Sequence, residues 1–390
     1  MKAYASDRTM KFTESVIREM TRICIKHQGV NLAQGFPDFS AAEEIKEAAV
    51  KAIRADFNQY AITWGTPSLR QAIAEKFSWY NGVSVDPERE ITVCCGSTEA
   101  MISSLMAIVN PEEEVIIFEP FYENYGPDTI LSGANPRFIT LHEPDWHFDE
   151  GELLRAFNEK TKAIIINTPN NPTGKVFSRE ELQFIADLCL KWGVVAITDE
   201  IYEHILFDGA THTSIASLPG MGEQTITINS ISKTYSLTGW RVGWAIAPAH
   251  LTASIRKVHD FLTVGSPHPL QEAAAVALRI DRGFYLRLAD EYLERRDFLL
   301  SALEGAGFHT HCPRGAYYIM TDVSYFDFPD DVAFAFYLVE KIGLATVPGS
   351  SFYSHPSLGS KKIRFCFPKK MSTLREAALK LQKLKMSSRA

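Results

Sequence analysis

The sequence predicts an α/β fold: a large domain with a mostly parallel mixed sheet flanked by helices, joined to a smaller α+β domain. Short apolar runs recur through the first two thirds of the chain, and they are unbroken rather than alternating, as expected of strands buried on both faces. Helical stretches lie between several of these runs, the order typical of a parallel sheet. The 390 residues suffice for two domains with a large core.

Two helices are predicted before the first apolar run. Ser40 is expected to begin the first one, because Glu43 lies three residues on and completes the signature of a capping box. Thr66 and Pro67 are expected to begin the second, with proline in the first turn and Gly82 after the last helical residue. Both helices precede the predicted sheet.

Six apolar runs are predicted as strands of the large sheet. They are "ITVCC" (91–95), "EVIIFEP" (114–120), "KAIIIN" (162–167), "VVAITDE" (194–200), "TITINS" (225–230) and "VGWAIAP" (242–248). A further helix is expected over "SREELQFIADLCLKWG" (178–193), between the third and fourth runs.

The pattern of apolar and polar residues changes after about residue 250, where long amphipathic helices are predicted to begin. A later group of elements follows in "AYYIMTDV" (316–323), "DVAFAFYLVEKIG" (331–343), "LATVP" (344–348), "IRFCF" (363–367) and "STLREAALKLQKLK" (372–385). We assign this group to the smaller domain and expect the N-terminal segment to complete it. The predicted division is 40–285 for the large domain, with 1–39 and 286–390 for the small one.

Composition narrows the class of protein. The net charge is −7, whereas a general nucleic-acid-binding surface would be basic, so a nucleic-acid partner is not expected. No stretch approaches the roughly 20 apolar residues that span a bilayer, and the first residues lack the apolar core of a secretory signal. A cytoplasmic protein without a membrane partner is expected.

The cysteines and histidines do not predict a metal site. The six cysteines form no C-x-x-C pair, and the neighbours Cys94 and Cys95 would point to opposite faces of a strand. Reduced and mostly buried thiols are therefore expected. His309 and His311 lie beside Cys312, but no further ligand has a suggestive spacing.

Polar residues follow the predicted strands at the edge where ligands bind to open parallel sheets. They are Gly96, Ser97 and Thr98 after the first run, Asn171 in a Pro/Gly-rich turn after the third, Asp199 and Tyr202 after the fourth, and Ser230 and Lys233 after the fifth. Alone, each has an ordinary explanation as a helix cap, a solvated turn residue, a packing tyrosine or a surface lysine. Their order and their shared sheet edge predict a ligand site, with a phosphate at the helix that follows Gly96.

Motifs of other catalytic and nucleotide-binding sites are incomplete or absent in the sequence. "SISK" matches the Ser-x-x-Lys of penicillin-binding proteins, but no SDN or KTG follows. A P-loop would need a glycine where Pro169 stands. Neither a G-x-G-x-x-G after a strand nor an H-E-x-x-H occurs.

The stretch "SISKTYSLTGWRVGW" (230–244) resembles the lysine signature of the class I, fold-type I, pyridoxal-phosphate-dependent aminotransferases. The order "NNPTG", "TDEIY" and "SKxxxxxGxR" is similar to the same family, as are "NLAQGFPDF", "NQYAITWGTPSLRQAI" and "IRFCF". The resemblance covers nearly the whole chain. "QGFPDF", "NTPNNPTGKVFSREEL" and "IRFCF" look most like the branch that contains kynurenine/glutamine aminotransferases and broad-specificity bacterial relatives.

The resemblance implies pyridoxal 5′-phosphate as the cofactor and assigns roles around its ring. Lys233 would bind the aldehyde carbon covalently and, once freed by substrate, would move the proton from Cα. Asp199 would pair with the pyridine N–H and keep the ring an electron sink. Tyr202 and Asn171 would hydrogen-bond the ring oxygen O3′, and Tyr122 would lie against the ring face.

The same resemblance implies where the phosphate and the substrate bind. Gly96, Ser97, Thr98, Ser230 and Arg241 would receive the phosphate.

Arg364 would hold the substrate α-carboxylate as a bidentate pair, with Asn171 beside it. Gly35 would leave room for that carboxylate and contact it through its backbone. Tyr60 would reach the phosphate of the neighbouring subunit, which implies a homodimer.

The implied reaction moves the amino group of an L-amino acid to a 2-oxo acid in two ping-pong half-reactions. Two alternatives on the same fold remain, a carbon–sulfur β-lyase and an aspartate-preferring aminotransferase. Thr98 stands where some dicarboxylate-preferring relatives place a lysine, which argues against aspartate. Val264 and Gly265 stand near where kynurenine/glutamine enzymes have an aromatic–histidine pair before a proline, here Pro267. We therefore expect a broad preference for neutral or aromatic donors, with 2-oxoglutarate or another 2-oxo acid as acceptor.

Overall fold

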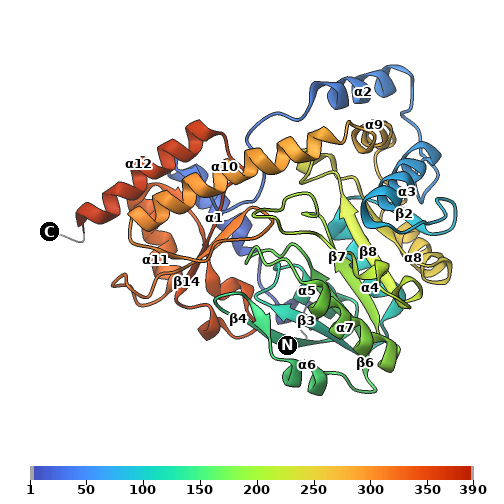
Figure 1. Cartoon of the computed structure of the whole chain (residues 1–390), viewed down its shortest axis with the longest axis horizontal. Coiled ribbons are helices and arrows are strands. Elements are labelled where there is room, and N and C mark those ends of the chain that lie inside the picture. The colour runs from blue at the N-terminus through green and yellow to red at the C-terminus, as the bar shows by residue number, and fades with distance from the viewer. Residues whose placement is uncertain (1–3, 388–390) are drawn as a thin grey trace.

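The computed structural model describes residues 4–387, and for residues 385–387 only the backbone. Its centre is an eight-stranded sheet of order β2-β9-β8-β7-β6-β3-β4-β5 (Figure 1). The strands are β2 (Ile91–Cys94), β3 (Glu114–Glu119), β4 (Asn135–His142), β5 (His147–Phe148), β6 (Thr161–Asn167), β7 (Val195–Asp199), β8 (Thr225–Ser230) and β9 (Gly243–Ile246). The run β8-β7-β6-β3-β4 is parallel, and β9 is antiparallel to both of its neighbours. The predicted mostly parallel mixed sheet is confirmed.

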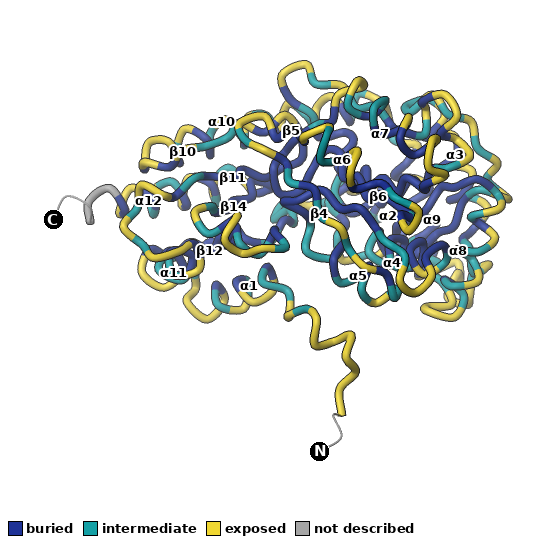
Figure 2. The backbone as a smooth tube through the Cα atoms, turned by 90° about the horizontal axis from the view of Figure 1, so that it is seen from below, coloured by how far each residue is buried: buried dark blue, intermediate teal, exposed yellow. Residues whose placement is uncertain are grey.

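The sheet is buried on both faces, as its unbroken apolar runs predict. Along β6, Ile164 and Ile166 face a core shared with α6 and α7, whereas Ala163 and Ile165 face a core shared with α4, α5 and α8. These helices are α4 (Ser97–Ile108), α5 (Tyr125–Leu131), α6 (Glu150–Ala156), α7 (Arg179–Trp192) and α8 (Ala249–Leu262). The dark interior of Figure 2 follows the same strands.

A third core lies at the β2 edge, between the sheet and α2 (Glu43–Arg54), α3 (Pro67–Asn81) and α9 (His268–Leu278). The predicted start of α3 is confirmed, since Thr66 caps it through its side chain and Gly82 ends it in a left-handed conformation. The predicted start of α2 at Ser40 is wrong. The chain stays extended up to Ala42, which packs against this core, and Glu43 pairs with Lys46 instead of closing a capping box.

The remaining elements form a second body of structure. A four-stranded antiparallel sheet has the order β10-β11-β14-β13, and β1 (Val30–Asn31) pairs in parallel with β12 (Leu344–Ala345). The other strands are β10 (His309–Thr310), β11 (Tyr318–Asp322), β13 (Val347–Pro348) and β14 (Lys362–Cys366), and the helices are α1 (Val16–Lys26), α10 (Gly283–Gly305), α11 (Asp331–Tyr337) and α12 (Met371–Ser387).

One hydrophobic cluster joins these elements, including α1 from the N-terminal segment and residues 201–207 that follow β7. The expected association of the N-terminal segment with the C-terminal elements is therefore observed, while the division at residues 40 and 285 stays a prediction. In Figure 1, α10 runs from the neighbourhood of α9 toward α12 and so bridges the two bodies. No helix among residues 4–387 is both long and apolar enough to cross a lipid bilayer.

In the large sheet, two strands were not foreseen from the sequence. The segment of β4, "NPRFITLH", contains a proline and alternates between exposed and buried residues, so it lacks the continuous apolar run used as the signal. β5 has only two residues, His147 and Phe148. The expected reduced cysteines are confirmed: all six are free, and four of them are buried.

A buried ion pair links α3 to the segment after β7. The ammonium group of Lys76 contacts the carboxylate of Glu203, and both side chains are at least 95% buried. Glu203 also accepts a hydrogen bond from Asn229. Because both charges are out of water, each depends on the other for compensation.

We expect Lys76→Met to lower the free energy of unfolding by roughly 3–5 kcal/mol, because Glu203 would be left charged and unpaired in the core. Urea unfolding followed by circular dichroism measures the effect. Arg22→Ala, which removes the exposed Arg22–Glu14 pair, is the matched control and should change the midpoint little. Adding Glu203→Gln to Lys76→Met should recover part of the loss; a double variant less stable than Lys76→Met would contradict the explanation.

Candidate active site

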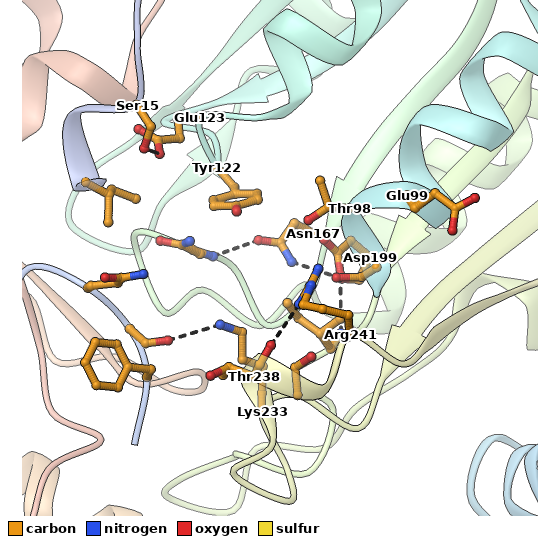
Figure 3. A pocket seen from close by; sticks show the side chains of 18 of the residues that line it. Ser15, Thr98, Glu99, Tyr122, Glu123, Asn167, Asp199, Lys233, Thr238 and Arg241 are labelled. Atoms are coloured by element: carbon orange, nitrogen blue, oxygen red, sulfur yellow. Dashed lines mark hydrogen bonds between the residues drawn. The ribbon is translucent and has the colours of Figure 1, made fainter. Parts of the chain in front are cut away.

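A cavity of about 750 Å³ lies at the carboxyl ends of β6, β7 and β8 and is also bordered by α1 and β14. The parallel register places Asn167 opposite Asp199, and Asp199 opposite Ile228, so the side chains that follow these strands emerge together. Figure 3 shows Lys233, Asp199 and Arg241 pointing into this common space. The predicted convergence of polar residues at this sheet edge is confirmed.

Lys233 lies in the turn after β8, with its amine directed into the cavity. Its Nζ donates to the carbonyl oxygen of Gly35 at 3.1 Å and lies 5.9 Å from the ring centre of Tyr202. Burial lowers the pKa of this amine to about 8, although Asp199 acts in the opposite direction. About a tenth of the Lys233 amine is therefore uncharged at pH 7, far more than for an ordinary lysine, and the uncharged form is the one that acts as a nucleophile or proton acceptor.

Asp199 ends β7 and is buried at the floor of the cavity. Its Oδ2 accepts a hydrogen bond from the hydroxyl of Tyr125 at 2.7 Å, and its Oδ1 accepts a longer one from the amide of Ile201. Burial raises the pKa of the carboxyl to about 6, while the bonds from Tyr125 and Ile201 lower it. The carboxylate can therefore accept a further hydrogen bond or compensate a cation.

Tyr202 and Asn171 lie on the side of the cavity that faces β11 and β14. The hydroxyl of Tyr202 shares a hydrogen bond of 2.9 Å with that of Tyr318. The side-chain oxygen of Asn171 accepts a bond of 2.7 Å from Arg364. Tyr122, from the segment after β3, also lines the cavity.

Arg364 on β14 is a fully buried cation with no carboxylate partner among the described residues. Its guanidinium group donates to Asn171 and to the carbonyl oxygen of Ala33, and it lies 4.3 Å from the ring centre of Tyr318. Its Nε has no hydrogen-bond partner. A buried guanidinium with a free donor is suited to a carboxylate ligand.

The opposite end of the cavity is built for an anion. Ser97 and Thr98 begin α4, where their backbone amides have no acceptor among the described residues. Arg241 adopts a left-handed conformation with φ 56° and holds its guanidinium there by donating to the carbonyl oxygens of Thr238 and Cys95. The hydroxyl of Ser232 is buried and has no partner.

Two glycines allow the turn before α4 to pack closely against Arg241 and β9 at this anion site. A Cβ atom on Gly96 would lie 2.2 Å from Arg241 Nη2. A Cβ atom on Gly243 would lie 2.5 Å from the backbone of Gly96 and Ser97. The turn before α4 can therefore approach both Arg241 and β9 only because these two positions lack side chains.

Two predicted residues take part in contacts within the chain. Ser230 is the last residue of β8 and is not among the residues that line the cavity; its hydroxyl accepts a bond from the amide of Ser232 and can still donate one. The phosphate contact of Ser230 stays a prediction, and Ser232 is a second serine that lines the cavity. Gly35 is required by packing, since a Cβ atom there would lie 2.1 Å from the hydroxyl of Tyr318.

Tyr60 is 87% exposed and is not among the residues that line the cavity. The two histidines that were considered as metal ligands make other contacts: His311 pairs with Glu143, and His309 stacks on Tyr325.

Several cavity residues were missed by sequence reasoning. Tyr125 follows Tyr122 by three residues in "EPFYENY", and Tyr318 lies in "AYYIMTDV", so both look like core aromatics in the sequence. Ser232 lies inside the stretch 230–244, but of the first two serines of that stretch only Ser230 was predicted to contact the phosphate. Arg18 lies on α1, and only the fold brings it to the cavity.

The donor set fits pyridoxal phosphate, as three separate features indicate. Lys233 offers an amine of lowered pKa to an aldehyde, and Asp199 offers a carboxylate to a pyridine N–H. The amides at the start of α4, Arg241 and the unpartnered hydroxyl of Ser232 offer donors to a phosphate. Arg364 remains for the carboxylate of a substrate.

Comparison with known proteins agrees with this chemistry. The sequence model of the family described as aminotransferase class I and II matches residues 27–381. Kynurenine–oxoglutarate transaminase 1 from Homo sapiens is 38% identical over 403 residues, covering 94% of this chain and 95% of that protein. Methionine aminotransferase from Escherichia coli is 36% identical, covering 95% of this chain and 96% of that protein.

Among solved structures, N-succinyldiaminopimelate aminotransferase from Mycobacterium tuberculosis superposes with a TM-score of 0.95 at 37% identity, covering 97% of this chain and 100% of that one. These matches favour transamination over carbon–sulfur lysis. The chain thus belongs to the class I and II aminotransferases and is a pyridoxal-phosphate-dependent enzyme that acts on amino acids and 2-oxo acids.

Proposed function

We propose that the protein transfers the amino group of a neutral or aromatic L-amino acid to a 2-oxo acid by a ping-pong mechanism, with Lys233 as its catalytic base. The observation that carries this proposal is the amine of Lys233, with a pKa near 8, in one cavity with the carboxylate of Asp199 and the unmatched cation of Arg364. Each half-reaction would exchange one amino acid for one 2-oxo acid at this site.

Bound pyridoxal phosphate supplies an aldehyde that takes up the amino group and a ring that accepts the electron pair of the broken Cα–H bond. Lys233 would hold the aldehyde carbon before substrate arrives and would then move the proton from Cα. Asp199 would accept a hydrogen bond from the pyridine N–H, with Tyr125 orienting the carboxylate. Tyr202 and Asn171 would hydrogen-bond O3′, and Tyr122 would lie against the ring.

Ser97, Thr98, Ser230 and Arg241 would receive the phosphate, with Ser232 as a further donor. Their donors converge on one end of the cavity, and the positive end of the α4 dipole adds to their attraction for a dianion. A phosphate bound at this end would leave the pyridine ring on the side of Asp199.

The proposed donors follow from the residues around Arg364. With the α-carboxylate on that guanidinium, the substrate side chain would face Ile17, Phe36 and Tyr122, which line the same cavity. No lysine follows β2 to bind an aspartate side chain, since that turn contains Thr98. Apolar surroundings of this kind favour a neutral or aromatic side chain over a charged one.

The proposed acceptors include 2-oxo acids with a second carboxylate, such as 2-oxoglutarate. Arg18 is exposed at the cavity, and no ion pair of its side chain is found among the described residues. After Lys233, Arg241 and Arg364 have been assigned, it is the remaining lysine or arginine that lines the cavity. A distal carboxylate could bind there without entering the apolar surroundings.

The homodimer, the contribution of Tyr60 to the partner's phosphate site and the cytoplasmic location are also proposed. The exposure of Tyr60 supports the second of these, because the aromatic ring projects from its own chain. Ile62 and Phe261 are large apolar residues that are also exposed, at 45% and 91%. Exposed apolar residues of this size are typical of surfaces that another chain covers.

The function is tested by supplying the purified holoenzyme with a panel of L-amino acids and with 2-oxoglutarate, pyruvate or a longer 2-oxo acid. We expect amino-group exchange, fastest with a neutral or aromatic donor, measured by chromatography of both products. Lys233→Ala should lower the rate by at least roughly 100-fold, because the proton at Cα would lose its base.

Lys51→Ala, at an exposed lysine on α2, is the control and should keep the rate. Release of pyruvate and ammonia from cystathionine without amine exchange would overturn the assignment. A rate highest by far with aspartate would overturn only the proposed donor class.

Gly243→Ala should weaken cofactor binding by roughly tenfold or more, equivalent to ~1.4 kcal/mol. The added methyl group would push the turn at Gly96 and Ser97 away from β9 and so displace the phosphate donors. Absorbance titration of the apoprotein with pyridoxal phosphate measures the affinity. Gly222→Ala is a control away from the cavity, because its Cβ would meet nothing within 4 Å and Gly222 is not among the cavity residues. Equal affinities of the two variants would count against the proposed phosphate site.

The contribution of Tyr60 across subunits can be tested by mixing two inactive variants, Tyr60→Phe and Lys233→Ala, at limiting cofactor. If Tyr60 acts in the partner's site, half of the sites in a mixed dimer contain both intact residues, and an equimolar mixture should regain about a quarter of wild-type activity. If Tyr60 acted within its own chain, each chain of the mixture would supply a defective site and no activity would return.

A further inference from the structure

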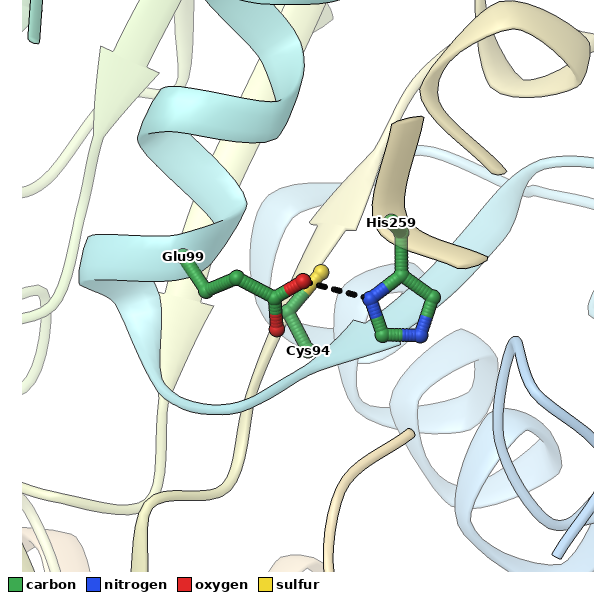
Figure 4. A group of neighbouring side chains, drawn as sticks. All are labelled: Cys94, Glu99 and His259. Carbon is green, nitrogen blue, oxygen red and sulfur yellow. Dashed lines mark hydrogen bonds and ion pairs between the residues drawn. The ribbon is translucent and has the colours of Figure 1, made fainter. Parts of the chain in front are cut away.

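A buried polar cluster lies next to the proposed phosphate site, and its side chains have no role in the proposed reaction. Glu99 in the first turn of α4 and His259 near the end of α8 form its centre, with Cys94 beside them (Figure 4). The exposed fractions of Glu99 and His259 are 7% and 0%. We call these two residues the Glu99–His259 pair.

Glu99 holds the turn that precedes α4. Its Oε2 accepts the hydrogen bond of the Cys95 amide, and its Oε1 accepts bonds from His259 Nδ1 at 2.6 Å and from Thr263 at 3.0 Å. The Gly96 amide donates to the carbonyl oxygen of Cys94. The amides of these two residues are thus engaged inside the turn, which leaves the next ones, from Ser97 on, for a ligand.

Both ring nitrogens of His259 have partners that accept hydrogen bonds. Nε2 lies 2.7 Å from the carbonyl oxygen of Thr63, which can only accept, so this nitrogen bears a hydrogen. Nδ1 faces the carboxylate of Glu99, and one further proton is shared between them. With its Nε2–H committed to Thr63 and its Nδ1 to Glu99, the ring offers no free lone pair, which argues against a metal site with Cys94.

The charge of the pair bears on phosphate binding. Glu99 lines the cavity and follows Ser97 and Thr98 directly, so an uncompensated carboxylate there would repel a phosphate dianion. Burial lowers the pKa of His259, but the hydrogen bond and charge of Glu99 outweigh this effect and leave the pKa raised. With one shared proton the pair has no net charge.

We propose that the Glu99–His259 pair is a positioning pair for the cofactor phosphate, in which Glu99 fixes the donor turn and His259 cancels the charge that Glu99 would otherwise present to the phosphate. The inference rests on the proposed phosphate site. The Nε2 bond to Thr63 also fixes the segment that contains Tyr60. His259 touches neither the cofactor nor the reacting atoms in this account.

The test compares the apoprotein's affinity for pyridoxal phosphate with its affinity for pyridoxal, which lacks the phosphate. His259→Asn should weaken binding of pyridoxal phosphate by roughly tenfold or more and leave pyridoxal within about threefold, because only the phosphate meets the exposed charge. The double variant with Glu99→Gln should recover most of the loss, since the charge is then removed.

Glu99→Gln alone should keep the ratio of the two affinities within about threefold, because a neutral histidine can face the amide. This variant keeps the test decisive if His259→Asn does not fold, as judged by urea unfolding. Equal losses for both ligands in His259→Asn, or a double variant that binds pyridoxal phosphate more weakly than His259→Asn, would overturn the inference.

The wild-type protein separates this inference from the proposal on which it rests. If the wild type bound pyridoxal as tightly as pyridoxal phosphate, the proposed phosphate site itself would fail. If the wild type prefers pyridoxal phosphate and His259→Asn keeps that preference, only the role of the Glu99–His259 pair fails.

Discussion

The register of three buried parallel strands is the constraint on which the site depends. β6, β7 and β8 are buried on both faces, so the charged side chains that line the cavity lie at or beyond the ends of these strands. Because the strands run in parallel and in register, those ends meet at one edge. Asn167, Asp199 and Lys233 are thereby brought to one cavity from positions up to 66 residues apart in the sequence.

The need to compensate charges explains which ligands the rest of the cavity favours. The cavity holds the buried carboxylate of Asp199 beside the cations of Lys233 and Arg364, and Arg241 adds a third positive charge at the far end, while the carboxylate of Glu99 is paired with His259. The charges are not matched within the chain, which leaves Arg364 and the start of α4 with free donors. Such an arrangement is stabilised by ligands that bring a carboxylate and a phosphate, and it selects them over neutral molecules.

The second body of structure closes the cavity from the other side. Arg364 comes from β14 and Gly35 from the segment after β1, and they contact Asn171 and Lys233, which follow the strands β6 and β8 of the large sheet. α1 contributes Ile17 and Arg18. The proposed side-chain specificity therefore depends mainly on N-terminal residues whose neighbours in the cavity, such as Tyr122 and Tyr318, lie more than a hundred positions away in the sequence.

The sequence by itself determined the mostly parallel sheet and the ends of its central strands, because burial on both faces leaves apolar runs, and it predicted the reaction centre from the motifs that contain Lys233, Asp199 and Arg364. It misplaced the start of α2 and missed β4 and β5, where packing overrides local signals. Only the tertiary structure decided that Ser232 lines the cavity, that Tyr125 holds Asp199, and that Glu99 is paired with His259. Those contacts depend on side-chain direction and on segments distant in the sequence, which periodicity does not encode.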